Sequence, residues 1–193
     1  MTDSKKIGIL LNAIDAYLGD ISTKTALQLA PYVALRPYNI RFAEWNEINF
    51  EEKIWIIPGP KMKMKKEHII PLTDTVINIL NTMKPHSYNK SIYVFPSPIS
   101  NLKPISENTL NYALKRLGYG DEIVSHGFRA MFSTVANEFI DDDNAHGVSR
   151  DIIEFQLAHK IDNKVGAAYN RALYLKQRTR LIQWWSDYLD GLK

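Results

Sequence analysis

The chain has 193 residues, long enough for one domain with a substantial hydrophobic core and short for two. Apolar residues make up 45%, charged residues 23%, and the net charge is +3, an ordinary balance for a soluble globular protein. The absence of cysteine excludes disulfides and thiolate metal sites and fits a cytoplasmic location. No segment approaches the roughly eighteen apolar residues of a membrane span, and no long apolar stretch follows the N-terminal lysines, so neither a membrane helix nor a signal peptide is expected.

The first quarter of the chain has apolar residues at helical spacing. They predict a helix over residues 5–18, with Ser4 as its N-terminal cap. A second helix is expected over residues 22–35, bent or interrupted by Pro31. A short helix over residues 38–45 is predicted to follow.

The pattern then changes to that of β-strands. Residues 53–57 predict a strand that stops at Pro58-Gly59-Pro60, and residues 67–70 predict a second strand. The two form a hairpin with four lysines in or beside its turn. Three further elements are predicted, namely a helix over residues 73–83, a short strand over residues 92–95 that could complete a small sheet, and a helix over residues 106–117.

The last third of the chain is predicted to be nearly all helical. Helices are expected over residues 126–139, 149–159 and 173–189, and a further turn or two carries Tyr169. The predicted fold class is therefore mainly α (α+β), a single helical domain over residues 1–193 with one small three-stranded antiparallel sheet.

Six polar residues scattered along the chain can be assembled into one phosphate-cutting site. Two arginines can hold the non-bridging phosphate oxygens, because the guanidinium group is a planar, permanently charged fork of donors. Lysine and histidine side chains can move protons, and a tyrosine can attack phosphorus and carry it covalently. The six residues are Arg36, Lys63, His126, Arg129, His159 and Tyr169.

These residues lie in short motifs whose order along the chain is more specific than any one of them. The motifs are Leu35-Arg36-Pro37, the basic run from Lys61 to Lys66 leading into His68-Ile69-Ile70-Pro71-Leu72, Ser125-His126-Gly127-Phe128-Arg129, Leu157-Ala158-His159, Ala167-Ala168-Tyr169-Asn170-Arg171, and Gln183-Trp184-Trp185. The ordered set resembles the catalytic domain of the tyrosine recombinases, also called phage integrases. It is most similar to the integrases of satellite phages and genomic islands, and the resemblance covers almost the whole chain.

The resemblance implies a role for each residue of the set. Arg36 and Arg129 would be the two phosphate-binding arginines, and His126 would handle protons and bond to the phosphate. His159 would donate a hydrogen bond to the scissile phosphate. Tyr169 would be the nucleophile, because the family places it nine or ten residues after the last histidine, whereas Tyr174 is a competitor five residues further on.

The catalytic lysine is harder to assign, because four lysines lie within six positions. The family's lysine lies eight residues before the proline that ends the second strand, which selects Lys63 when counted back from Pro71. It would act as the general acid that protonates the departing 5′ oxygen. Lys61 and Lys65 are the alternatives. The lysines expected to contact the DNA backbone are Lys61, Lys65 and Lys66.

Two features bear on the limits of the resemblance. The family usually follows Arg-Pro with Gly-Glu, whereas this chain has Tyr38-Asn39, which puts the residues that support the site in question. The acidic run from Asp141 to Asp143 invites a metal site, but adjacent carboxylates in a loop cannot all face one ion without a special loop. Neither a metal nor a cofactor is therefore expected.

The implied function is a site-specific DNA recombinase that cleaves and rejoins DNA through a 3′-phosphotyrosyl intermediate, for integration or excision of a prophage or genomic island. Its partners would be double-stranded DNA attachment sites, accessory DNA-bending or excision factors, and other copies in a tetramer formed through the last helix around Trp184 and Trp185. The family's N-terminal arm-binding and core-binding domains are expected to be missing from this chain, so weak DNA binding and weak recombination activity are expected of it alone. The alternatives are a non-catalytic DNA-binding or interaction module of the same fold, and a type IB topoisomerase-like enzyme.

Overall fold

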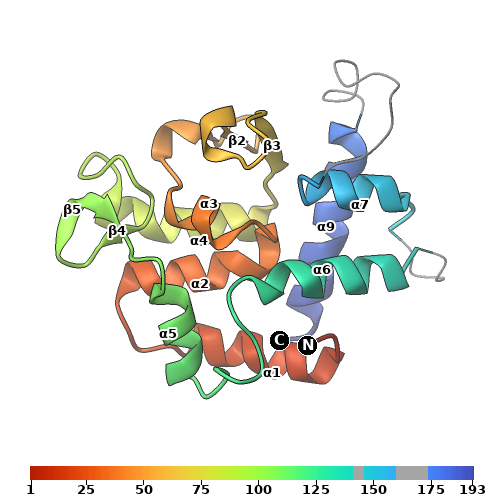
Figure 1. Cartoon of the computed structure of the whole chain (residues 1–193), viewed down its shortest axis with the longest axis horizontal. Coiled ribbons are helices and arrows are strands. Elements are labelled where there is room, and N and C mark those ends of the chain that lie inside the picture. The colour runs from red at the N-terminus through yellow and green to blue at the C-terminus, as the bar shows by residue number, and fades with distance from the viewer. Residues whose placement is uncertain (141–145, 160–173) are drawn as a thin grey trace.

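The computed structural model describes residues 1–140, 146–159 and 174–193. Helices form most of it, and two small sheets lie at its periphery (Figure 1). Helix α2 runs through the middle, and ten of its thirteen residues are buried, as expected of a helix covered on nearly all sides. The helices are α1 (Ser4–Asp15), α2 (Ile21–Val33), α3 (Pro37–Arg41), α4 (Asp74–Ser87), α5 (Thr109–Arg116), α6 (Gly127–Glu138), α7 (Arg150–Gln156) and α9 (Leu175–Gly191), with short 3₁₀ turns η1 (Trp45–Glu47) and η2 (Gly59–Lys61).

Acidic side chains cap the first two helices. The carboxylate of Asp3 accepts from the backbone N–H of Lys6 at the start of α1, so the expectation that Ser4 is the cap is wrong by one residue. Asp20 does the same for α2 by accepting from Thr23. A carboxylate at this position satisfies a free N–H and interacts favourably with the positive end of the helix dipole.

The predicted hairpin forms the larger sheet, but its third strand is not the predicted one. The hairpin strands β2 (Ile54–Ile57) and β3 (His68–Pro71) pair antiparallel, with Ile57 opposite His68. The third strand is β1 (Ile48–Asn49), which pairs with β2 on its other edge. The prediction of a strand over residues 92–95 is wrong. A second sheet, outside the prediction, contains β4 (Pro96–Ser97) and β5 (Ser100–Pro104).

The segment 92–95 fails to extend the sheet because its backbone partners belong to a loop. Tyr93 makes one isolated bridge with Glu44, and the N–H of Val94 bonds to the carbonyl of Ala43. Val94 and Phe95 are both fully buried. Their apolar character therefore reflects packing into the core rather than membership of a strand.

Helix α9 packs against α2, and one of its side chains binds a backbone carbonyl at the C-terminal end of α2. The indole N–H of Trp185 donates to the carbonyl of Pro31, 2.8 Å away, in the last turn of α2. The last carbonyls of a helix have no partner within it, so Trp185 satisfies one of them. Trp185 is 0% exposed, so this indole is a core residue and is not available to a neighbouring protomer. Trp184 is half-buried, with its ring among the aromatic rings of Phe139, His146 and Tyr188.

A buried arginine joins β3, α7 and α9. The guanidinium of Arg178, on α9, donates to the side-chain oxygen of Gln156 at the end of α7 and to the backbone carbonyl of Ile69 on β3. Arg178 is 2% exposed, and burial lowers its pKa to about 9. Among the described residues no carboxylate forms an ion pair with it. The cost of burying this charge is therefore offset by hydrogen bonds to neutral oxygens.

His68 lies against this arginine and is kept neutral. Its Nε2 donates to the carbonyl of Gln156 at 3.0 Å, and Nη2 of Arg178 lies 3.5 Å from the same nitrogen. Burial, followed by the positive charge of Arg178 and smaller contributions from Arg129 and Arg36, lowers the pKa of His68 to about 3, although the hydrogen bond to Gln156 acts in the opposite direction. A protonated ring here would be a buried cation among three arginines.

We predict that His68 makes the protein less stable in acid. The unfolded chain takes up this proton near the ordinary pKa of about 6.5, whereas the folded protein takes it up only near pH 3. Stability therefore falls as the pH is lowered through that window, by up to about 1.4 kcal/mol per pH unit. Urea unfolding between pH 7 and pH 4 measures this slope, which the His68→Gln variant should reduce.

The matched control is His86→Gln on α4, because His86 is exposed. This variant should keep the wild-type slope. A His68→Gln variant with the same pH slope as wild type would contradict the prediction.

Candidate active site

The candidate site is built around Arg129, near the start of α6. This residue is 4% exposed, and two backbone carbonyls hold its guanidinium group. Nη1 donates to the carbonyl of Ala34 at 2.8 Å, and Nη2 donates to the carbonyl of Leu157 at 2.7 Å. Ala34 ends α2, and Leu157 ends α7. One side chain from α6 therefore joins the C-terminal ends of two other helices, where unpaired carbonyls are available.

Left-handed backbone conformations turn the chain at both of these helix ends. Ala34 has φ 48° and Ala158 has φ 52°. After α7, the N–H of Ala158 bonds to the carbonyl of Phe155, and that of His159 to the carbonyl of Glu154. This pair of bonds is a Schellman motif, and the turn brings His159 back over the last turn of its own helix.

His159 is held between a carboxylate and an arginine. Its Nδ1 lies 2.7 Å from Oε2 of Glu154, and its Nε2 lies 3.2 Å from Nη2 of Arg129. The His159 side chain is 43% exposed and that of Glu154 is 30% exposed. The imidazole is therefore fixed in orientation while one side stays open to solvent.

Arg36 lies close to Arg129, although the two are far apart in sequence. Arg36 precedes α3 as its N-cap and is half-buried, two residues after the Ala34 carbonyl that binds Arg129. Burial, followed by the positive charge of Arg36, lowers the pKa of Arg129 to about 10, and Glu154 acts in the opposite direction. The two guanidinium groups thus act on each other within one region.

His126 completes this group of cationic residues. It is the exposed N-cap of α6, three residues before Arg129. Burial lowers its pKa, and the charges of Arg129, Arg36 and His159 lower it further. A neutral ring is therefore favoured at His126. We call Arg36, His126, Arg129 and His159 the basic cluster. The structure brings together these four of the six residues predicted from the sequence.

The lysines of the hairpin divide into one that is held and three that are exposed. The ammonium group of Lys61 contacts carboxylates of Glu44 at 2.6 Å and Glu47 at 2.5 Å, and it donates to the carbonyl of Phe42. Although burial lowers the pKa of Lys61, the two carboxylates outweigh burial and raise it above the ordinary value. The exposed lysines are Lys63, Lys65 and Lys66.

Asn39 occupies the position at which the resemblance leads one to expect a glutamate. It is 3% exposed, and its side-chain amide donates to the carbonyl of Lys61 at 3.1 Å. The residue therefore connects α3, directly after Arg36, to the backbone of the lysine hairpin. A neutral amide serves this contact because the partner is a carbonyl, to which a carboxylate cannot donate.

Tyr169 and the acidic run Asp141–Asp143 lie outside the described residues. The competing nucleophile Tyr174 is described. It caps α9, is half-buried, and packs its ring against Phe155 with centroids 5.8 Å apart. Within the described ranges, no group of three or more histidine and acidic side chains could hold a metal ion. No helix in them has both the length and the apolar character needed to cross a bilayer.

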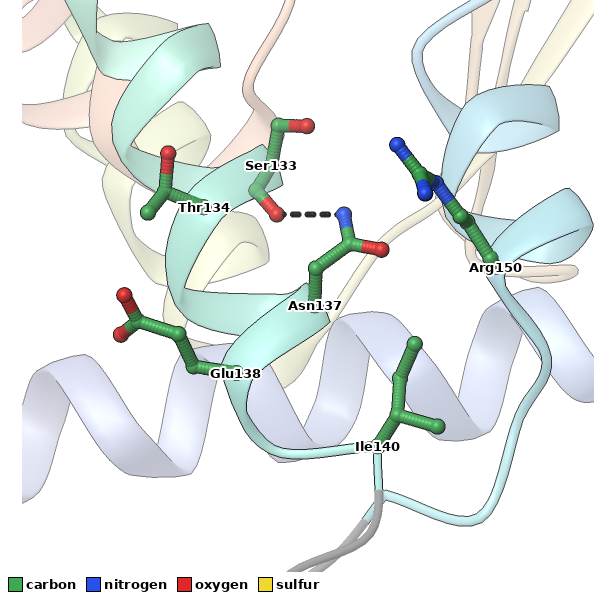
Figure 2. A pocket seen from close by; sticks show the side chains of 6 residues that line it. All are labelled: Ser133, Thr134, Asn137, Glu138, Ile140 and Arg150. Atoms are coloured by element: carbon green, nitrogen blue, oxygen red, sulfur yellow. Dashed lines mark hydrogen bonds between the residues drawn. The ribbon is translucent and has the colours of Figure 1, made fainter.

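A cavity of about 500 Å³ lies elsewhere, over the outer face of α6 (Figure 2). None of the described residues that line it belongs to the basic cluster, and the charged side chains among them are Glu138 and Arg150. The amide of Asn137, at its centre, bonds back to the carbonyl of Ser133. The described lining residues of the cavity therefore lie apart from the basic cluster.

Sequence reasoning missed three residues that shape the site. Glu154 could have been found from its spacing. It lies five residues before His159, and a Schellman turn at the end of a helix brings residues with this spacing together. Asn39 was noted only as a departure from the family's pattern. The spacing of Arg178 relative to Leu181, Ile182 and Trp185 places it on the apolar face of the last helix, and this signal was overlooked. Its partners on β3 and α7 could not be found from the sequence, because they are distant along the chain.

The chain is similar to known proteins along most of its length. The model of the phage integrase family matches residues 1–176. Prophage integrase IntA of Escherichia coli K12 is 41% identical over 171 residues, which cover 89% of this chain and 40% of that protein. The integrase of Enterobacteria phage P4 is 36% identical over 203 residues, covering 97% of this chain and 44% of that protein. The chain thus spans less than half the length of these relatives.

Solved structures share the fold at low sequence identity. The integrase from mycobacterium phage Brujita superposes with a TM-score of 0.67 at 17% identity, covering 96% of this chain and 62% of that one. The XerA recombinase gives a TM-score of 0.60 at 14% identity, with 97% and 62% coverage. The family match extends over nine-tenths of the sequence and the curated relatives exceed 30% identity, so the chain belongs to the phage integrase family.

Proposed function

We propose that this chain is the catalytic domain of a site-specific DNA recombinase, which cuts and rejoins DNA through a covalent phosphotyrosine. The observation that carries the proposal is the guanidinium of Arg129, fixed by two helix-end carbonyls beside Arg36 and two histidines. Two arginines together can bind a phosphodiester and neutralise the charge that develops on phosphorus during displacement. Fixing Arg129 before the substrate arrives avoids reorganisation of this group during the reaction.

Strand cleavage is a displacement at phosphorus. The phenol oxygen of Tyr169 bonds to phosphorus, the bond from phosphorus to the 5′ oxygen breaks, and the products are a 3′-phosphotyrosyl link and a 5′-hydroxyl. The phenol proton passes to His126, whose lowered pKa keeps its ring neutral and able to accept. His159 donates a hydrogen bond to a non-bridging phosphate oxygen. A 5′-hydroxyl of the partner strand then attacks the phosphotyrosine, so the bond energy is conserved.

Lys63 is the general acid in this proposal. Lys61, its first alternative, is bonded to two carboxylates that raise its pKa, so its proton is held against transfer. Lys63 is exposed on the same hairpin, two residues from the backbone that Asn39 anchors. Lys65 and Lys66, also exposed, would contact the DNA backbone, and Lys61 would instead hold the hairpin to η1.

The substrate class is double-stranded DNA that carries an attachment site of a prophage or genomic island. Exchange of both strand pairs requires four copies of the chain on DNA, and accessory DNA-bending or excision factors would act with them. Since Trp185 is buried, contacts between copies would use other parts of the last helix.

The nucleophile is tested with a nicked duplex that spans the attachment site, because loss of a short fragment after cleavage traps the covalent product. The wild-type chain should form a protein–DNA adduct that survives denaturing electrophoresis. Tyr169→Phe should abolish the adduct, because phenylalanine has no oxygen to attack phosphorus. Tyr174→Phe should leave it.

Two outcomes would overturn parts of this assignment. Loss of the adduct in Tyr174→Phe alone would move the nucleophile to Tyr174. Tight DNA binding by the wild-type chain with no adduct under any condition would favour a binding module of the same fold.

The general acid is tested with DNA whose 5′ bridging oxygen is replaced by sulfur. Lys63→Ala should slow cleavage of ordinary DNA by about 10²- to 10⁴-fold, the usual contribution of a general acid. A thiolate leaves without being protonated because a thiol pKa is only about 8.5. Cleavage of the sulfur-substituted DNA by Lys63→Ala should therefore approach the wild-type rate.

The neighbouring exposed lysines provide the comparison. Lys66→Ala should weaken DNA binding, most visibly at high salt, with no recovery specific to sulfur. If Lys65→Ala is rescued by sulfur and Lys63→Ala is not, Lys65 is the general acid.

A further inference from the structure

His159, one of the two histidines of the basic cluster, has two partners that require the same arrangement of protons on its ring. Nδ1 of His159 lies 2.7 Å from a carboxylate oxygen of Glu154, which can only accept, so Nδ1 carries a proton. Nε2 lies 3.2 Å from Nη2 of Arg129, which can only donate, so Nε2 presents its lone pair in the neutral ring. Both contacts select the Nδ1–H tautomer.

The backbone also holds Glu154 and His159 together. The Schellman turn after α7 places the His159 N–H on the carbonyl of Glu154, so both the backbone and the side chain of Glu154 bind this one histidine. Glu154 is on the last turn of a helix whose end carbonyl, from Leu157, holds Arg129. The carboxylate is therefore fixed relative to both the histidine and the arginine.

We propose that Glu154 is a positioning residue of the recombinase reaction, which holds Nδ1 of His159 and so directs Nε2 towards Arg129 and the phosphate that Arg129 would bind. This inference rests on the proposed function, in which His159 donates from Nε2 to the phosphate. Because Nδ1 already carries a proton, donation from Nε2 requires an imidazolium. Arg129 contacts Nε2 on one side of the ring, and the carboxylate of Glu154 contacts Nδ1 on the other side.

Substitutions at Glu154 separate orientation from charge. Glu154→Ala removes both the acceptor and the charge, and the rate of adduct formation on the nicked duplex should fall about 10- to 100-fold, the usual effect of removing a partner that orients a functional histidine. Glu154→Gln keeps an oxygen that accepts from Nδ1 but loses the charge, so its rate should lie between those of Glu154→Ala and wild type. DNA affinity, measured separately, should change little.

Asp151→Ala is the matched control, because it removes an exposed carboxylate from the same helix without touching His159. It should cleave at the wild-type rate. A Glu154→Ala variant that cleaves as fast as Asp151→Ala overturns the proposal. Thermal unfolding of each variant identifies any rate that falls through loss of folding, and in that case Glu154→Gln decides.

A second measurement does not depend on catalysis. Long-range ¹H–¹⁵N spectra of the free protein, recorded where the His159 ring is neutral, report which ring nitrogen carries the proton. The Nδ1–H tautomer is expected in wild type and in Glu154→Gln, with loss of this preference in Glu154→Ala. An Nε2–H ring in wild type overturns the proposal even if the chain forms no adduct. Conversely, an Nδ1–H ring without any adduct would contradict the proposed function and leave the contact itself standing.

Discussion

The candidate site depends on the burial of one guanidinium group. A buried charge is costly unless hydrogen bonds replace its hydration. Arg129 meets this requirement with the carbonyls of Ala34 and Leu157, which α2 and α7 leave unpaired at their C-terminal ends. The three helices therefore meet at one point. The residues that follow these two helix ends, Arg36 and His159, are brought to the same place by that meeting.

A second buried guanidinium repeats this principle on the neighbouring side of α7. Arg178 binds Gln156 and the backbone of β3, and so joins α9 to the strand that leads out of the lysine hairpin. Between α7 and α9 the sequence contains Tyr169. Arg129 holds the end of α7, and Arg178 holds α7 together with the start of α9. In the proposed reaction, both boundaries of the segment that contains the nucleophile are thus held by buried arginines that donate to neutral carbonyl and amide oxygens.

The polar residues around these arginines have distinct tasks. Lys61 and Asn39 attach the lysine hairpin to the loop and helix near Arg36, which leaves Lys63 free on the surface. Glu154 sets the orientation of His159 and moderates the positive charge of the cluster. In this cationic region, the side chains that contact a carboxylate, Lys61 and His159, are held in place, whereas Lys63 has an exposed ammonium group.

The helices, the hairpin and the ordered set of polar motifs could be read from the sequence, because helical spacing, turn residues and motif order are properties of neighbouring positions. The same reasoning failed where a residue's partner is distant in sequence. Segment 92–95 is apolar because Val94 and Phe95 enter the core, and Trp185 is buried because its indole reaches Pro31 across the fold. The sequence by itself determined the family and the candidate chemistry. Only the tertiary structure decided which cations are buried, which lysine is held, and how His159 is oriented, because burial and hydrogen bonding depend on segments that meet after folding.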